Sequence, residues 1–228
     1  MVVAIITARA NSKGLPGKNM IDVGGMPLLA YSLATASATT AFDRVILSTD
    51  MDAAIDLASD FPRVEVPFKR PAELCSDTAT HAEVVDHLLQ YLEKESGLPE
   101  YIVLLQPTSP FRRVEEMERG VSLLKNGAKS VLGVCPVMHH PAEYLYKDAQ
   151  NKTNYLMPEF KELRRQEYPD IYFNNGAFYG VSVPFYQKTK QFFDDNSELL
   201  VMGEQSLIDI DTPFDLILAR AVAEHYKK

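Results

Sequence analysis

The sequence predicts an α/β protein built on a doubly wound, mostly parallel sheet. Stretches dominated by apolar and β-branched residues, without alternation of apolar and polar positions, occur at 2–7, 44–49 and 101–105, and such stretches are typical of parallel strands buried on both faces. Segments with the helical spacing of apolar residues follow these runs. Strands that alternate with helices in this way indicate a sheet covered by helices on both faces.

The first half of the chain supplies most of these elements. The run at 2–7 is expected to form the central strand of the sheet, and Pro27 is well placed to open a helix at 28–39. The other elements expected in this half are helices at 53–59, 81–93 and 114–125 and strands at 44–49, 101–105 and 130–134.

The pattern changes in the second half. Residues 135–174 are richer in Tyr, Pro and charged residues, which predicts an inserted arm of hairpins and loops. Asn175 and Gly176 mark a turn. The elements expected after this turn are strands at 177–181, 199–202 and 207–210, a helix at 187–193, and a last helix to about 226 that Thr212 caps, with Pro213 at its first position. Since no linker divides the chain, we expect a single domain, 1–228, with an arm inserted at about 136–196.

Composition narrows the class of protein. The formal net charge of −8 and the pI near 5.2 argue against general binding of nucleic acid. The two cysteines, Cys75 and Cys135, match no metal-binding spacing, and we expect both to be inert and reduced. The sequence shows no signal-peptide pattern and no apolar run near 18 residues. We therefore expect a cytoplasmic protein that has no membrane partner.

A polar loop follows the first apolar run and concentrates positive charge. It holds Arg9, Lys13 and Lys18 together with Gly14 and Gly17, and glycines let backbone N–H groups approach phosphate oxygens while Arg and Lys supply charge. The motif GxxxxGK[ST] does not fit, because asparagine follows the lysine. The loop either binds nucleotide phosphates or is merely solvated.

Two other polar segments could form the walls of the same pocket. The irregular stretch 67–80 carries an Arg, prolines and several hydroxyl groups, and long irregular loops in compact domains are usually functional. The run at 101–105 leads directly into the polar segment 106–110. In doubly wound sheets, ligands bind at the carboxyl ends of the strands.

A pair of carboxylates lies near the end of the chain. Asp209 and Asp211 are two residues apart in a strand-like segment, so both would point to the same face. Two such charges are costly unless a cation lies between them, and Mg²⁺ held by carboxylates and substrate phosphates is the natural occupant. The alternative is that Asp211 belongs to the cap of the last helix and Asp209 lies on the surface.

Taken together, these segments resemble the acylneuraminate cytidylyltransferases, the CMP-sialic acid synthetases of bacterial type. The matching segments run in order along nearly the whole chain: ARANSKGLPGKN at 8–19, FDRVILSTD at 42–50, RPAELCSDTAT at 70–80, LLQPTSPFR at 104–112, HHP at 139–141, RRQE at 164–167, NGAFY at 175–179 and SLIDIDTPFDL at 206–216. The resemblance implies a Rossmann-like nucleotidyltransferase fold and transfer of CMP from CTP to the anomeric hydroxyl of a nine-carbon α-keto acid sugar.

The resemblance also implies roles for individual residues. Those matching triphosphate-binding positions are Arg9, Ser12 and Lys18, with Lys18 stabilising charge on the α-phosphate. Asn19 and Arg70 match contacts to ribose and cytosine, and Ala79 offers backbone groups to the base. Asp209 and Asp211 match the Mg²⁺ ligands. Lys18, Arg9 and Asp211 are thus the residues expected to carry catalysis, which requires positioning and charge neutralisation but no covalent nucleophile.

The sugar site is where the sequence departs from its relatives. Gln106 and Tyr179 match sugar-binding positions, while Phe192 and Phe193 match an aromatic pair that in the family comes from the partner subunit of a dimer; ordinary core packing is the alternative. The family's lysine and arginine in this site fall here near Glu143 and Phe173. The residues that could replace these cations are Lys147, Arg164 and Arg165.

Several functional alternatives stay open at this point. The substrate could be an N-acylneuraminate or a bacterial relative such as legionaminic or pseudaminic acid. A second enzyme class with the same chemistry is the cytidylyltransferase for the eight-carbon sugar Kdo. A different class is a catalytically inactive nucleotide-binding module. In the leading interpretation the protein binds CTP, Mg²⁺ and the sugar and acts as a homodimer through its arm.

Overall fold

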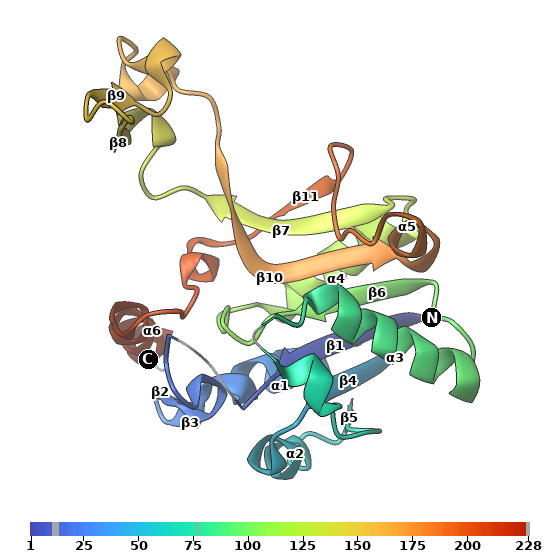
Figure 1. The fold of residues 1–228 in the computed structure, drawn as a ribbon. Coiled ribbons are helices and arrows are strands. Elements are labelled where there is room, and N and C mark those ends of the chain that lie inside the picture. The colour runs from blue at the N-terminus through green and yellow to red at the C-terminus, as the bar shows by residue number, and fades with distance from the viewer. Residues whose placement is uncertain (11–13, 77, 227–228) are drawn as a thin grey trace.

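The computed structural model describes residues 1–10, 14–76 and 78–226 and contains a seven-stranded sheet (Figure 1). The strand order is β11-β7-β10-β6-β1-β4-β5. The strands of this sheet are β1 (Val2–Ala8), β4 (Arg44–Thr49), β5 (Val64–Glu65), β6 (Tyr101–Leu105), β7 (Ser130–Pro136), β10 (Tyr172–Ser182) and β11 (Glu198–Val201). Neighbouring strands are parallel except for β10, which runs antiparallel to both β6 and β7.

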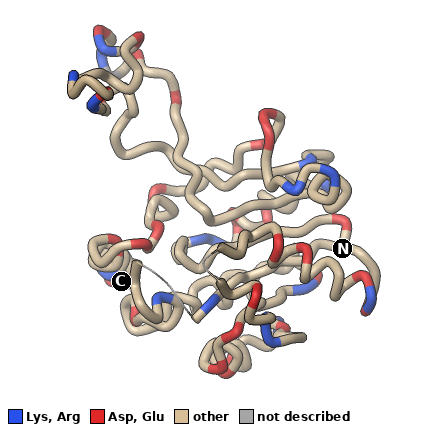
Figure 2. Tube along the Cα trace, in the orientation of Figure 1, with Lys and Arg blue, Asp and Glu red and all other residues tan. Residues whose placement is uncertain are grey.

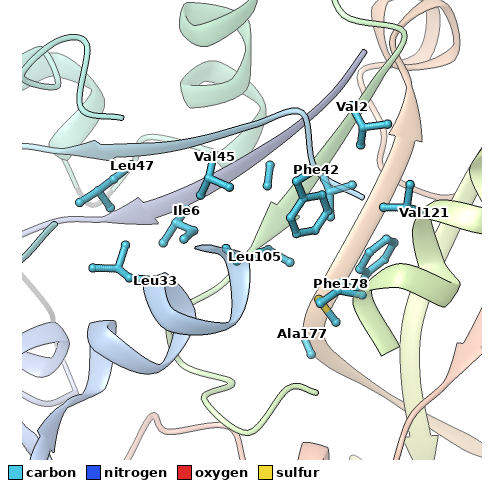
Figure 3. Close-up of a cluster of buried hydrophobic side chains, with 14 of the residues drawn as sticks. Val2, Ile6, Leu33, Phe42, Val45, Leu47, Leu105, Val121, Ala177 and Phe178 are labelled. Carbon is cyan, nitrogen blue, oxygen red and sulfur yellow. The ribbon is translucent and has the colours of Figure 1, made fainter. Parts of the chain in front are cut away.

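Helices cover both faces of the sheet, as a doubly wound fold requires. The α-helices are α1 (Leu28–Ala38), α2 (Asp52–Ala58), α3 (His81–Glu95), α4 (Val114–Lys125), α5 (Val183–Thr189) and α6 (Pro213–Tyr226). One core cluster joins α1, α2 and α4 to the sheet and includes Leu33, Phe42 and Phe178 (Figure 3). The other joins α3 and α5 to the opposite face through Leu88 and Tyr186. The predicted α/β fold class is therefore confirmed.

Alternate residues of β1 supply the two cores. Val2, Ala4 and Ile6 belong to the cluster under α1, whereas Val3 and Ile5 belong to the cluster under α3. All five are at most 1% exposed, which explains why the sequence shows an unbroken apolar run here instead of alternation. β1 lies between β4 and β6 as an interior strand, although the middle of the seven is β6.

β10 differs from the prediction. Asn175 and Gly176 do not form a hairpin turn; they lie inside one long strand, where its register with β7 shifts between Asn174 and Tyr179. Gly176 has a φ of 68°, and a Cβ there would lie 2.6 Å from Oε1 of Gln106. The dipeptide is thus an irregularity that brings the backbone of β10 against the tip of β6.

Two other local predictions are also wrong. The helix expected at 187–193 is α5, which begins earlier and ends where Lys190 adopts a left-handed conformation with a φ of 55°. The strand expected at 207–210 is an extended segment that follows the short 3-10 helix η6 (Glu204–Leu207). A backbone hydrogen bond joins this segment to the loop after β6: the Ile210 N–H donates to the Thr108 carbonyl oxygen at 2.8 Å.

Residues 137–171 leave the sheet and form a lobe that projects from it (Figure 1). The lobe contains the hairpin of β8 (Leu145–Lys147) and β9 (Thr153–Tyr155) and the 3-10 turns η3 (Pro141–Glu143), η4 (Pro158–Phe160) and η5 (Arg165–Glu167). It is shorter than the expected arm, because β10 and α5 pack on the sheet. Acidic and basic positions are interspersed on the lobe as on the rest of the molecule (Figure 2).

The remaining elements connect the first loop with the C-terminal helix. They are η1 (Lys18–Met20), η2 (Ala72–Cys75) and a small hairpin of β2 (Asp22–Val23) and β3 (Met26–Pro27). A third core cluster joins Leu15 and Val23 to Ile210, Ala219 and other residues. Within the described part of the chain, every helix is too short or too polar to cross a membrane.

Candidate active site

Two adjoining cavities lie near the carboxyl ends of β1 and β6. The first, here called the polar cavity, has a volume of about 440 Å³ and is lined by the first loop, the loop around η2, the tip of β6 and the extended segment before α6. The polar side chains that line it include those of Arg9, Lys18, Asn19, Arg70, His81, Gln106, Thr108, Asp209 and Asp211. Residues as far apart in the sequence as Arg9 and Asp211 thus line one cavity.

Lys18 joins the first loop to the extended segment before α6. Its Nζ donates to Oδ1 of Asp211 at 2.7 Å. Gly17 precedes it with a φ of 65°, which favours glycine and allows the chain to turn into η1. Gly14 lies against the Asp211 carbonyl oxygen, where a Cβ would approach to 2.4 Å. The loop and the carboxylate segment are therefore fitted to each other through backbone contact as well as charge.

Two arginines line the same cavity. Arg9 Nη1 donates to the Ser76 carbonyl oxygen at 2.7 Å, which ties the end of β1 to the irregular loop after η2. Arg70 is buried; its Nε donates to Oγ of Ser48 at 3.0 Å, and its Nη2 donates to the Ser48 carbonyl oxygen. Burial lowers the pKa of the Arg70 guanidinium, and Arg9 lowers it further.

The predicted nucleoside contacts lie between these cations. Asn19 is buried, and its Nδ2 donates to the Arg9 carbonyl oxygen at 3.0 Å. Ala79 lines the cavity immediately before the capping box of α3, in which Thr80 and Glu83 hydrogen-bond to each other's backbone. The cap fixes the start of α3, and so it also fixes the backbone beside Ala79.

The two aspartates face the cavity differently. Asp209 is half-buried, and its Oδ1 is buried without a hydrogen-bond partner. Burial raises the pKa of the Asp209 carboxyl, and the neighbouring charge of Asp211 raises it further, whereas a hydrogen bond from Thr108 opposes the shift. Asp211 is exposed, and its backbone N–H donates to Asp215, which also accepts from Thr212 in the cap of α6.

This pair fits a divalent cation. An unpartnered buried carboxylate oxygen is costly, and a hard cation is the ligand that would satisfy it while relieving repulsion between the two acids. No three His, Cys, Asp or Glu side chains of the described residues are grouped to hold a metal. Oxygen atoms of a bound ligand would have to complete the coordination.

The second cavity, here called the aromatic cavity, has a volume of about 590 Å³. Its lining consists of His81, Leu104, Gln106, Tyr179, Gln191, Phe192, Phe193, Asp194 and Asp195. Phe192 packs against Tyr179 and Tyr186 with centroid distances of 6.0 and 5.3 Å. Phe193 is 48% exposed. Because both Phe residues follow α5 in a loop, they are not constrained to point to different sides as neighbours on a helix are.

Gln106 stands on the wall between the two cavities. Its backbone carbonyl accepts from Nη2 of Arg112, a buried side chain that also donates to Ala177 and Ser32, at 2.7 Å each. Gly176 leaves room for the Gln106 side chain. β6, β10 and α1 thereby hold this wall in place through one arginine.

The structure brings most of the predicted site residues together. Arg9, Lys18, Asn19, Arg70, Ala79, Gln106, Asp209 and Asp211 line the polar cavity, and Gln106, Tyr179, Phe192 and Phe193 line the aromatic cavity. The two Phe residues thus line a cavity of their own chain, whereas the resemblance implied a pair from the partner subunit. Ser12 lies outside the described residues. Arg165 belongs to η5 in the lobe, and its side chain is likewise outside the described part.

Other predicted residues stand apart, and one was missed. Glu143, Lys147 and Arg164 lie in the lobe, and Phe173 in β10 is 43% exposed; none of them lines either cavity. His81, which lines both cavities, was not among the residues predicted for the site. Its position directly after the irregular loop, at the start of α3, was the available signal.

The chain is similar to several known proteins over almost its whole length. The family model described as Cytidylyltransferase matches residues 3–224. A CMP-N,N′-diacetyllegionaminic acid synthase of Legionella pneumophila is 33% identical, with 98% of this chain and 96% of that protein covered. A pseudaminic acid cytidylyltransferase of Campylobacter jejuni is 27% identical, with 96% and 94% covered.

Other similar proteins differ more in length or sequence. An N-acylneuraminate cytidylyltransferase of Escherichia coli is 30% identical over 98% of this chain, which spans 52% of that protein. Among solved structures, a CMP:2-keto-3-deoxy-manno-octonic acid synthetase complexed with CTP has a TM-score of 0.68 at 16% identity and covers 99% of both chains. That likeness shows the fold. Because the family model matches almost the whole chain, this chain belongs to the cytidylyltransferase family.

Proposed function

We propose that this protein transfers CMP from CTP to the anomeric hydroxyl of a nine-carbon α-keto acid sugar and releases pyrophosphate. One observation carries the proposal: a cavity with cations and paired carboxylates adjoins a cavity with aromatic walls, and the two share Gln106 and His81. The reaction needs a triphosphate and a sugar side by side. The relatives named for legionaminic, pseudaminic and N-acylneuraminic acids support this class of substrate.

The polar cavity suits the nucleotide. Lys18 and Arg9 would neutralise phosphate oxygens as the bond to the leaving pyrophosphate breaks, which is the main demand of phosphoryl-type transfer. Arg70 and Asn19 are held rigidly by β4 and by the first loop, and we assign them to the nucleoside together with the backbone at Ala79. No covalent nucleophile is needed for this chemistry.

We propose Asp209 and Asp211 as the protein ligands of Mg²⁺. The buried, unpartnered Oδ1 of Asp209 supports this assignment. When bound, the ion supplies charge neutralisation for the phosphates and orients them. Asp211 now pairs with Lys18; in the complex Lys18 would face the phosphate oxygens of the nucleotide, and Asp211 would face the metal ion.

The aromatic cavity suits an acylated sugar. Gln106 offers an amide for sugar hydroxyls, and Tyr179, Phe192 and Phe193 form an apolar wall for an acyl group. We propose N-acylneuraminate or a diacylamino relative such as legionaminic acid as the substrate. The legionaminic acid relative supports the second of these.

We also propose a homodimer formed through the lobe. The lobe exposes large apolar side chains, among them Met138, Leu145 and Leu156 with exposures of 63%, 57% and 53%, and exposed apolar patches mark interaction sites. We place the reaction in the cytoplasm, in keeping with two cysteines that are both free.

A substrate panel tests the proposal. The protein is incubated with CTP, Mg²⁺ and, separately, N-acetylneuraminic, legionaminic, pseudaminic and eight-carbon Kdo acids, and products are identified by mass spectrometry. We expect a CMP-sugar and pyrophosphate with at least one nine-carbon acid. A product with Kdo alone would replace the nine-carbon class. Calorimetric binding of CTP without any product would favour an inactive nucleotide-binding module.

A further inference from the structure

His81 lies at the junction of the two cavities. His81 and Gln106 line both, and among the titratable side chains of the described residues His81 alone does so. Asp194 and Asp195 line only the aromatic cavity, whereas Asp209 and Asp211 line only the polar cavity. A proton acceptor that serves both spaces can therefore come from one position of the described chain.

The reaction takes place at this junction. If the proposed function is correct, a hydroxyl oxygen of the sugar in the aromatic cavity bonds to the α-phosphorus of the nucleotide in the polar cavity. The reacting atoms must then meet where the cavities adjoin, because the two groups have to approach to about 3–3.5 Å. The hydroxyl has to lose its proton in this step.

The imidazole is ready to accept a proton. Its Nε2 lies 3.0 Å from Nε2 of Gln106, and since an amide nitrogen only donates, the imidazole Nε2 is the acceptor and Nδ1 carries the proton. Desolvation lowers the pKa of His81, and the charges of Arg70 and Arg9 lower it further. The ring is thus neutral at neutral pH, although it borders open space. The other charged groups that line the two cavities around it are Lys18, Asp194, Asp195, Asp209 and Asp211.

We propose that His81 is the general base of the transfer. Its Nε2 takes the proton of the anomeric hydroxyl while that oxygen forms its bond to the α-phosphorus. The bond from the α-phosphorus to the bridging oxygen breaks, and its electron pair leaves with pyrophosphate. The imidazolium then gives its proton to water. Gln106 donates to Nε2 before the sugar binds and donates to the sugar afterwards, so the hydroxyl replaces the amide as the donor to His81.

The pH dependence of the rate tests this role. For the wild type, kcat/KM for the sugar falls tenfold for each pH unit below the pKa of His81, because the protonated ring cannot act as a base. In the His81→Gln variant this acidic limb disappears, and kcat at higher pH falls about 10²-fold or more. The KM for CTP stays within about twofold. Imidazole added to the His81→Ala variant restores part of the lost rate.

A second histidine of the same helix provides the control. His87 packs edge-on against Phe68, with 4.6 Å between the ring centroids, and lines neither cavity. His87→Gln therefore keeps the wild-type rate and the wild-type decline of the rate at low pH. Thermal melts establish that the variants are folded. A His81→Gln enzyme with the wild-type kcat and an unchanged acidic limb would overturn the inference while leaving the proposed function intact. A wild-type enzyme that is inactive with every sugar of the panel would overturn the proposed function itself.

Discussion

Replacing Lys18 by alanine separates stability from catalysis. Nζ of Lys18 lies 2.7 Å from Oδ1 of Asp211. The Lys18 side chain is 14% exposed, but the Asp211 side chain is 68% exposed. An ion pair with one solvated partner contributes only about 0–1 kcal/mol to the free energy of unfolding. We therefore expect the melting temperature of Lys18→Ala to change by at most a few degrees.

The effect on the chemical step should be far larger. A donor aimed at charge that develops in the transition state contributes about 2.7–4 kcal/mol, which corresponds to about 10²–10³ in kcat. Steady-state release of pyrophosphate with the preferred sugar measures this loss. Lys18→Arg should recover only part of it, because the guanidinium keeps the charge but not the compact shape of the ammonium.

Lys69 is a matched control for this experiment. Its Nζ pairs with Asp52 at 2.6 Å, yet it lines neither cavity. Lys69→Ala should thus keep the wild-type kcat and KM. If Lys18→Ala had a kcat within threefold of the wild type, or lost no more activity than Lys69→Ala, the assignment of Lys18 to the phosphates would be refuted.

Three further changes test other parts of the site. Asp209→Asn should raise the Mg²⁺ concentration for half-maximal activity about tenfold or more, since it removes charge from the proposed ligand pair; a metal titration of the rate measures this. Gly176→Ala should destabilise the fold by about 1–3 kcal/mol in denaturant melts and raise the KM for the sugar, because its φ is 68° and its Cβ would approach Gln106 to 2.6 Å. Leu145→Glu, at a side chain 57% exposed on the lobe, should shift the protein from dimer to monomer in sedimentation experiments.

Each of these changes has a result that would contradict its premise. An unaltered metal titration in Asp209→Asn would remove this residue from the metal site. A Gly176→Ala protein with wild-type stability and KM would mean that the β10 irregularity does not position Gln106. A wild-type protein that is monomeric at micromolar concentration would exclude dimerisation through the lobe before any variant is made.

The strands of the first half could be predicted closely, because strands that are buried on both faces have nearly continuous apolar sequences. β4 and β6 have the bounds expected from the sequence, and β1 extends one residue further. Their residues are mostly apolar and do not alternate with polar ones, so no periodicity competes with the strand interpretation. The chemistry-bearing residues follow from the same strands, since Arg9 and Gln106 come just after β1 and β6.

The second half was less predictable because its elements depend on contacts distant in sequence. Asn175 and Gly176 have the composition of a hairpin turn, but β10 pairs with β7 both before and after them, which keeps them inside one strand. The residues around Asp209 are apolar enough for a strand, yet this segment is extended without belonging to the sheet, and the backbone bond from Ile210 to Thr108 holds it beside the tip of β6. No local pattern reveals such partners.

His81 shows the same limit for the site. A histidine at the start of a helix is usually a capping or surface residue, and its neighbours in the sequence give no other sign. Its importance depends on Gln106, 25 positions away, and on two cavities that exist only after folding. The charged residues of the polar cavity could therefore be predicted from the sequence, whereas His81 at the junction of the two cavities could not.

The most direct test of the central claim is a crystal structure with Mg²⁺ and a CTP analogue that cannot be cleaved between the α- and β-phosphates. We expect the triphosphate in the polar cavity, with Nζ of Lys18 within hydrogen-bond distance of a phosphate oxygen and the metal bound by Asp209 and Asp211. A triphosphate beyond the reach of Lys18, or a metal that neither aspartate contacts, would contradict the claim.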